Sequence, residues 1–209
     1  MVSAHDYRIT GPDSSDYIFV FAHGAGGGMD APFMAAIAEG LSNEGIRTLR
    51  FEFPYMAEMR RTGKRRPPDR PQVLTEHWLQ VIAEMATAST LVIGGKSMGG
   101  RVASLVADGA GVAGLVCLGY PFHPPGRPEK LRTEHLAALQ TPTLFLQGER
   151  DPFGTREQVR GYSLSPAIRT VFVEDGDHSF VPRASSGRTA LENLNFAAHE
   201  ISTFIETLG

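Results

Sequence analysis

The sequence predicts an α/β fold: a three-layer α/β/α sandwich around a doubly wound, mostly parallel sheet. Three observations support this. Short apolar runs of strand length alternate with segments of helical spacing along the whole chain. Several runs are apolar at nearly every position, which is typical of parallel strands buried on both faces. Glycine-rich or charged segments follow several runs, where such a sheet places its ligand-binding loops.

Length and composition predict one domain, residues 1–209. Of the 209 residues, 42% are hydrophobic and 21% are charged, so the chain is long enough to bury a core. Its formal net charge of −3 creates no field that favours nucleic acid or an anionic membrane. The first residues lack signal-peptide features, and no apolar run is long enough to span a bilayer. We therefore expect a cytoplasmic protein without nucleic-acid or membrane partners.

Six strands are expected, each from a short apolar run. The first, 17–22, is apolar throughout and leads into the glycine-rich segment 23–28, while the second is ended by Pro54. Cys117, the only cysteine, lies in the fourth run, where we expect a buried thiol without an internal disulfide. The expected strands are 17–22, 45–53, 90–94, 114–119, 142–147 and 169–174.

Helical segments are expected between these strands. Segment 31–43 has apolar residues at helical spacing from Phe33 to Leu41, and Gly45 follows as a stop signal. The last segment carries an apolar face from Leu194 to Leu208. The expected helices are 31–43, 74–88, 130–140, 155–163 and 191–208, together with one that starts after Ser97.

Segment 54–73 does not fit the alternation. It contains six cations and two acids, and we expect a long unstructured loop. Two interpretations remain open: a solvated basic loop, or a surface that recruits an anionic substrate or partner. Neither this segment nor the glycine-rich run fits the phosphate-loop pattern G-x-x-x-x-G-K-[ST], which argues against phosphate-loop chemistry.

A nucleophile elbow is indicated between the third strand and the helix after it. Gly95 to Gly99 fits G-x-S-x-G, with Ser97 as the nucleophile. The flanking glycines have a steric cause, because a Cβ would clash with the elements packed beside the turn. The alternative is that Ser97 simply caps a helix, since serine is a preferred N-cap.

The partners that a serine nucleophile needs appear downstream in the required order. A serine hydroxyl needs a base, and the base needs a carboxylate that fixes its tautomer. Asp151 follows the fifth strand and His178 follows the sixth, which is the order Ser, Asp, His of α/β-hydrolases. Glu149 is a rival for the acid, but Asp151 precedes a proline that fixes a turn past the strand end. We therefore expect Ser97, Asp151 and His178 to be the catalytic residues.

The other acids and histidines have structural explanations. Asp175 and Asp177 are too close to His178 in sequence to orient it and are expected in a turn. His23 ends the first strand, where a backbone-bonding role is favoured. The remaining histidines, apart from one near the pocket, lie near the terminus or on expected helices: His5, His77, His135 and His199. No metal-ligand spacing is present, and we expect no metal or cofactor.

The oxyanion hole is expected to use two backbone amides. One belongs to Met98, the residue after the nucleophile, and the other to Ala25 in the first glycine-rich loop, with Gly26 as the alternative. A wider set of strand-end residues is expected to line the pocket, although its aromatic members fit plain packing equally well. This set is Gly24, Gly26, Tyr120, Phe122, His123 and Phe180.

These motifs, HGAGGG, GKSMGG, GERDPFG and GDHSF, resemble the α/β-hydrolase superfamily over nearly the whole chain. The chain looks most like the small, lidless branch near the dienelactone hydrolases. It is also similar to the hydrolase-like domain of a regulatory subunit of the nonspecific-lethal histone acetyltransferase complex. The resemblance implies an eight-stranded sheet or a trimmed version, the triad named above, and esterase-type chemistry. Dienelactone hydrolases use a cysteine where this chain has Ser97, so their substrate is not transferred.

Together these features predict a carboxylesterase-like serine hydrolase. Segment 120–141 is too short for a lid domain, so we expect an open site for a small, soluble carboxylic ester, with a thioester or amide less favoured. A perhydrolase or acyltransferase would use the same triad. The rival class is a catalytically silent scaffold module that binds a partner through the basic 60–70 loop. The oligomeric state stays open.

Overall fold

The computed structural model describes residues 6–85 and 90–209. It contains a seven-stranded sheet in the order β1-β3-β2-β4-β5-β6-β7, in which only the pair β1–β3 is antiparallel. The predicted fold class is confirmed. The strands are β1 (Arg8–Thr10), β2 (Tyr17–Ala22), β3 (Arg47–Phe51), β4 (Thr90–Lys96), β5 (Gly114–Leu118), β6 (Thr143–Gly148) and β7 (Ile168–Val173).

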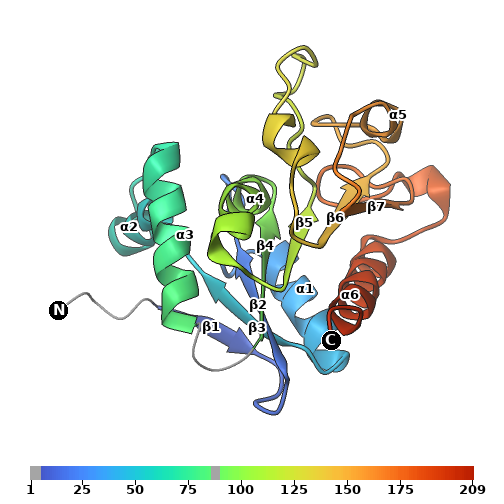
Figure 1. Cartoon of the computed structure of the whole chain (residues 1–209). Coiled ribbons are helices and arrows are strands. Elements are labelled where there is room, and N and C mark those ends of the chain that lie inside the picture. The colour runs from blue at the N-terminus through green and yellow to red at the C-terminus, as the bar shows by residue number, and fades with distance from the viewer. Residues whose placement is uncertain (1–5, 86–89) are drawn as a thin grey trace.

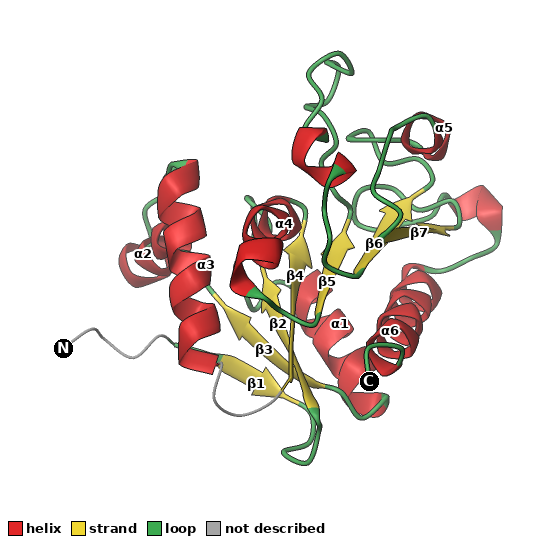
Figure 2. Cartoon of the chain, in the orientation of Figure 1, coloured by secondary structure: helices red, strands yellow, loops and turns green. Residues whose placement is uncertain are grey.

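Helices cover both faces of this sheet (Figures 1 and 2). Helices α3 and α4 pack on one face and α1 and α6 on the other, which gives the three layers. No helix in the described part of the chain is long and apolar enough to cross a membrane. The helices are α1 (Pro32–Asn43), α2 (Pro54–Thr62), α3 (Pro71–Met85), α4 (Met98–Ala110), α5 (Arg156–Arg160) and α6 (Ala190–Glu206), with 3₁₀ turns η1 (Glu134–Ala137) and η2 (Ala184–Ser186).

Strand side chains alternate between two apolar cores. In β2, Val20 belongs to the core under α3 and α4, whereas Phe19 and Phe21 belong to the core under α1 and α6. A strand buried on both faces has no polar positions to alternate, which explains its uniformly apolar sequence. Cys117 is a free, fully buried thiol in β5, and burial raises its pKa well above the usual value.

Strand β1 was not predicted. It has only three residues, Arg8, Ile9 and Thr10, and its side chains are largely exposed, so it carries no apolar run. It forms by pairing antiparallel with β3, where Ile9 faces Leu49. A short, polar edge strand of this kind leaves little local signal in a sequence.

The basic segment 54–73, which was expected to be one long loop, is largely helical. Pro54 occupies the first turn of α2, a position where its missing N–H costs nothing, and Gly63 ends the helix at a φ of 70°. Only residues 63–70 remain as a loop before α3. Several of its cations have acidic partners within the chain; Arg60, for example, contacts the carboxylates of Asp6 and Glu52, both at 3.1 Å.

Two expected helices are also corrected. Segment 130–140 contains only η1, because its backbone bonds to neighbouring loops: Arg132 N–H donates to Phe122 O at 2.8 Å, and Leu136 O accepts from Ser165 N–H at 3.0 Å. Segment 155–163 is helical only over α5. Helix α3 begins three residues before its expected start. Residues 86–88 of that expected helix, and His5, lie outside the described residues.

Trp78 anchors α3 to the sheet, and its replacement tests this packing. Its ring is fully buried and meets Phe51 edge-on at 4.7 Å. We expect Trp78→Ala to lower the free energy of unfolding by about 3–5 kcal/mol, because a cavity remains. Urea unfolding followed by far-UV circular dichroism measures this, since Trp78 is the only tryptophan. Leu79→Ala, at a neighbouring exposed position, serves as the control, and equal losses in both variants would contradict the assignment.

Candidate active site

Ser97 is the single residue between the end of β4 and the start of α4, and its backbone conformation is strained. Its φ is 51° and its ψ is −113°, a region that residues with a Cβ rarely adopt. Two backbone hydrogen bonds hold it there: Ser97 N–H donates to Leu118 O at 2.9 Å, and Ser97 O accepts from Arg101 N–H at 3.0 Å. The turn therefore presents the serine hydroxyl at the carboxyl end of the sheet.

The flanking glycines allow this turn to pack closely against its neighbours. A Cβ on Gly95 would lie 2.5 Å from the backbone nitrogen of Gly100. A Cβ on Gly99 would lie 2.6 Å from the backbone oxygens of both Ala22 and His23. These contacts are with backbone atoms that cannot rotate away, so glycine is required at both positions, as the sequence motif predicts.

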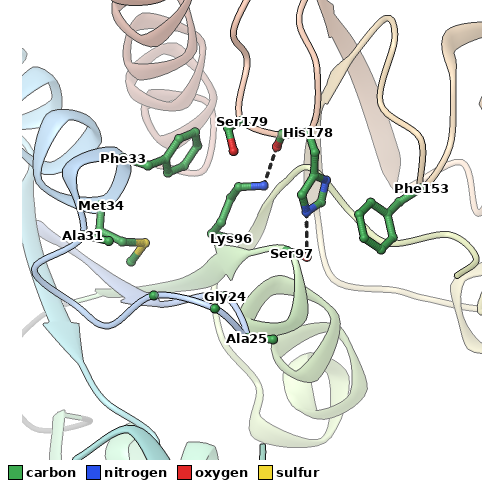
Figure 3. Close-up of a pocket in the computed structure, with 12 residues that line it drawn as sticks. Gly24, Ala25, Ala31, Phe33, Met34, Lys96, Ser97, Phe153, His178 and Ser179 are labelled. Carbon is green, nitrogen blue, oxygen red and sulfur yellow. Dashed lines mark hydrogen bonds between the residues drawn. The ribbon is translucent and has the colours of Figure 1, made fainter. Parts of the chain in front are cut away.

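Ser97, His178 and Asp151 form a continuous hydrogen-bonded chain. Ser97 Oγ lies 2.9 Å from His178 Nε2, and His178 Nδ1 lies 2.8 Å from Asp151 Oδ2 (Figure 3 shows the first of these bonds). Asp151 is fully buried and also accepts from Gln147 Nε2 at 3.0 Å and Phe153 N–H at 2.9 Å. With only donors around this carboxylate, Nδ1 carries the proton and Nε2 is free to accept from the serine hydroxyl.

The rival acids lie in other interactions. Glu149 contacts Arg156 and accepts from Asp175 N–H at 2.9 Å, so its carboxylate is directed away from the histidine. Asp175 binds the side chain and backbone of Arg183. Asp177 accepts from two backbone amides of the turn that follows it. The structure therefore brings Asp151 to His178 and leaves these other carboxylates as turn and ion-pair residues.

His23 holds the glycine-rich loop. Its Nδ1–H donates to Gly24 O at 2.7 Å, while its Nε2 accepts from Phe53 N–H at 3.1 Å. Burial lowers the pKa of His23 from 6.5 to about 4, so the ring is neutral at pH 7. The hydroxyl of Tyr55 donates to Ala25 O at 3.1 Å. Two side chains thus fix the loop through its carbonyl oxygens, and neither ring is available for proton transfer with Ser97.

The hydroxyl of Ser97 opens into a cavity of about 360 Å³. The glycine-rich loop forms one side of it, α1 provides an apolar wall, and His178 closes the other side (Figure 3). Of the residues expected to line the pocket, Gly24 and Gly26 do so, whereas the α1 wall, Lys96 and Phe153 are not predicted from the sequence. The lining residues are Gly24, Ala25, Gly26, Gly27, Ala31, Phe33, Met34, Lys96, Ser97, Phe153, His178 and Ser179.

Four residues expected in the pocket do not line it. Tyr120 and Phe122 are fully buried in the core under α3 and α4. His123 is buried as well, with its Nδ1 bonded to the carbonyl of the next residue at 2.9 Å. Phe180 is fully buried, and its ring packs edge-on against Phe33 with 5.4 Å between the ring centroids. Their strand-end positions predict the correct edge of the sheet, but the side chains are directed into the interior.

Phe153 contacts the imidazole directly. Its ring lies 4.3 Å from the ring of His178, with an angle of 36° between the two planes. This contact and the bond to Asp151 hold the imidazole from two sides. The sequence contains one indication that Phe153 belongs to the site, because this residue lies two positions after Asp151 in the same strand-end loop.

Lys96 is a buried cation in the wall of this cavity. Its Nζ donates to His178 O and lies 5.3 Å from the centroid of the Phe33 ring. Burial lowers the pKa of Lys96 from 10.5 to about 8, although the carboxylates of Asp151 and Asp177 act in the opposite direction. The side chain therefore remains mostly charged at neutral pH.

Among the described residues, no group of three or more His, Cys, Asp or Glu side chains is arranged to hold a metal ion.

Comparisons with known proteins identify the family to which this geometry belongs. The model of the alpha/beta hydrolase domain family matches residues 15–206. Among solved structures, a dienelactone hydrolase from Anabaena variabilis is 20% identical, with a TM-score of 0.71 over 96% of this chain and 90% of that one.

Two further structures share the fold. A lidless serine hydrolase from Xanthomonas campestris is 20% identical, with a TM-score of 0.68 over 93% of this chain and 86% of the other. A protein from Mycobacterium tuberculosis described as a putative non-heme bromoperoxidase is 13% identical, with a TM-score of 0.75 over 100% of this chain and 98% of the other. These three structures show that proteins with 20% or less sequence identity to this chain share its fold.

Substitution of Gly99 tests the steric basis of the turn, and Gly109 in the same helix is the matched control. We expect Gly99→Ala to lower the free energy of unfolding by at least about 2 kcal/mol, because its methyl group overlaps two carbonyl oxygens. A Cβ on Gly109 meets no atom within 4 Å, so Gly109→Ala should be neutral or stabilise by up to about 1 kcal/mol. Thermal unfolding measures both. A Gly99→Ala variant as stable as Gly109→Ala would exclude the proposed clash.

Neutral, buried His23 predicts a loss of stability in acid. Below about pH 6.5 the unfolded chain binds a proton at this residue, whereas the folded protein does not until about pH 4, so stability falls as the pH falls. Relative to His23→Gln, the wild-type free energy of unfolding should drop by roughly 2 kcal/mol between about pH 7.5 and pH 5. Urea unfolding of both proteins at the two pH values measures this difference. A constant difference would show that His23 titrates normally.

Proposed function

Because the chain belongs to the alpha/beta hydrolase family, we propose that it is a serine hydrolase that cleaves a small carboxylic ester through an acyl-enzyme. One observation carries this proposal: the hydrogen-bonded chain from Ser97 through His178 to Asp151, with the serine hydroxyl opening into a cavity. The family accounts for hydrolase chemistry in general, and the geometry supports a serine nucleophile in particular.

In the first step, Ser97 Oγ attacks the ester carbonyl carbon. The new C–O bond forms as the hydroxyl proton moves to His178 Nε2, and the carbonyl π electrons move onto the carbonyl oxygen. Asp151 stabilises the imidazolium that results and does not itself take the proton. Because this carboxylate already accepts from Gln147 and from a backbone amide, its position is fixed before the reaction begins.

Two backbone amides are proposed to stabilise the oxyanion. Met98 is the first residue of α4, where a backbone N–H has no partner within the helix. Ala25 belongs to the loop that His23 and Tyr55 hold by its carbonyl oxygens, and it lines the cavity. Donors held rigidly in this way do not need to reorganise when negative charge develops.

The intermediate then collapses and water completes the cycle. The proton on His178 passes to the leaving alcohol as its C–O bond breaks, which leaves an acyl ester on Ser97. His178 next takes a proton from water, whose oxygen attacks the acyl carbon, and returns that proton to Ser97 Oγ. A cavity of about 360 Å³ favours a compact acyl group over a long lipid chain.

Covalent labelling tests the proposal. We expect a fluorophosphonate to form one stoichiometric adduct with the wild-type protein, because only an activated serine displaces fluoride readily. The adduct should be lost in Ser97→Ala and in His178→Ala, and hydrolysis of 4-nitrophenyl acetate should fall by roughly 10³-fold or more in both. Intact-mass spectrometry and initial rates measure these outcomes.

Controls separate this result from nonspecific labelling. Ser185→Ala removes an exposed serine in η2 and should retain the full adduct. Circular dichroism confirms that each variant is folded. If folded wild-type protein formed no adduct, the serine-hydrolase proposal would be wrong, and a role as a binding module would become the better explanation of the fold.

A further inference from the structure

We infer that Lys96 selects esters that carry a second, anionic group, a carboxylate on the same compact substrate. This inference rests on the proposed function, because it concerns the substrate of the same site. The observation that carries it is a buried ammonium group in the wall of the cavity into which Ser97 opens (Figure 3).

The described lining of the cavity contains a cationic side chain and no acidic one. Among the described residues that line it, Lys96 is the one lysine or arginine, and none is Asp or Glu. The carboxylates that act on the charge of Lys96 belong to Asp151 and Asp177, and neither residue lines the cavity. Asp151 bonds to His178 and two further donors, and Asp177 bonds to backbone amides. An incoming carboxylate would therefore meet a cation whose acidic neighbours already have other partners.

The ammonium group also has donors to offer. It carries three N–H bonds, and within the described part of the chain one hydrogen bond to a protein acceptor is formed, to the carbonyl of His178. Lys96 is only 8% exposed, and a charge with so little contact with bulk water gains most from a charged, hydrogen-bonding ligand. Its pKa of about 8 keeps it protonated at neutral pH, as anion binding requires.

The shape of the site suggests what joins the two ends of the substrate. Phe33 and Met34 form an apolar wall beside Lys96, and the ammonium lies 5.3 Å from the Phe33 ring. Such a wall suits a short hydrocarbon linker between the ester carbonyl and the carboxylate. The volume of about 360 Å³ restricts the linker to a few carbon atoms or one ring.

A purely structural role for Lys96 makes a different prediction. Its bond to the carbonyl of His178 ties the end of β4 to the histidine loop, so any substitution is expected to lower catalysis somewhat. A tether alone would lower the hydrolysis of charged and uncharged esters by the same factor. A selectivity role would lower the hydrolysis of the charged ester further, so the ratio of the two kcat/KM values distinguishes the two roles.

Two matched ester pairs provide the test. In the first, mono-4-nitrophenyl adipate is compared with its uncharged primary amide, which places the anion on the acyl side. In the second, 3-acetoxybenzoate is compared with 3-acetoxybenzamide, which places it on the leaving-group side. We expect wild-type protein to prefer the anionic member of at least one pair by about ten- to a hundredfold in kcat/KM. Lys96→Met should abolish that preference, and Lys96→Arg should retain part of it.

Controls and contrary outcomes are defined by the same measurements. Lys130→Met removes an exposed lysine outside the cavity and should leave the ratio unchanged. If wild-type protein forms the fluorophosphonate adduct but hydrolyses both members of each pair equally, the inference is wrong and the hydrolase proposal stands. A preference that survives in Lys96→Met also overturns the inference. Absence of the adduct would overturn both.

Discussion

The close approach of α4 to the ends of β2 and β4 is the constraint on which the site depends. Gly95 and Gly99 touch backbone atoms of neighbouring elements, and Ser97, between them, adopts a positive φ. A strained residue persists only where its surroundings fix it more strongly than the strain opposes it. Here the buried residues of β2, β4 and α4 supply that rigidity, so the energy gained in core packing holds the serine side chain in a position that local preferences disfavour.

Around this turn, the buried polar groups are held by burial and by hydrogen bonds. The carboxylate of Asp151 accepts hydrogen bonds from donors on three residues, which fixes its position. His23 is neutral because burial opposes its charge, and it uses both ring nitrogens to join a loop to a strand end. Burial lowers the pKa of Lys96 to about 8, and its ammonium group donates to the carbonyl oxygen of His178. The low polarity of the interior strengthens each of these interactions.

The sequence is sufficient where a pattern has a steric or periodic cause. The parallel strands follow from uniformly apolar runs, and the order of Ser97, Asp151 and His178 follows from the strand-end loops of the fold. The sequence is insufficient where tertiary contacts determine which secondary structure forms. β1 exists only as a partner of β3, α2 depends on Pro54 at a helix start instead of a strand end, and residues 130–140 bond to other loops. The direction in which a side chain points also cannot be predicted from sequence spacing. For this reason the sequence does not predict that Phe33 and Phe153 line the pocket, and its prediction that Tyr120 does so is wrong.

The residues of the hydrogen-bonded chain come from distant parts of the sequence: Ser97 and His178 are 81 positions apart, and Asp151 and His178 are 27 apart. The glycine-rich loop, held by His23 and Tyr55, adds a fourth distant segment. A fragment that lacks any one of these segments therefore lacks part of the site. Under the proposed function, turnover requires the whole folded chain, so the rate of hydrolysis would serve as a direct gauge of the folded fraction.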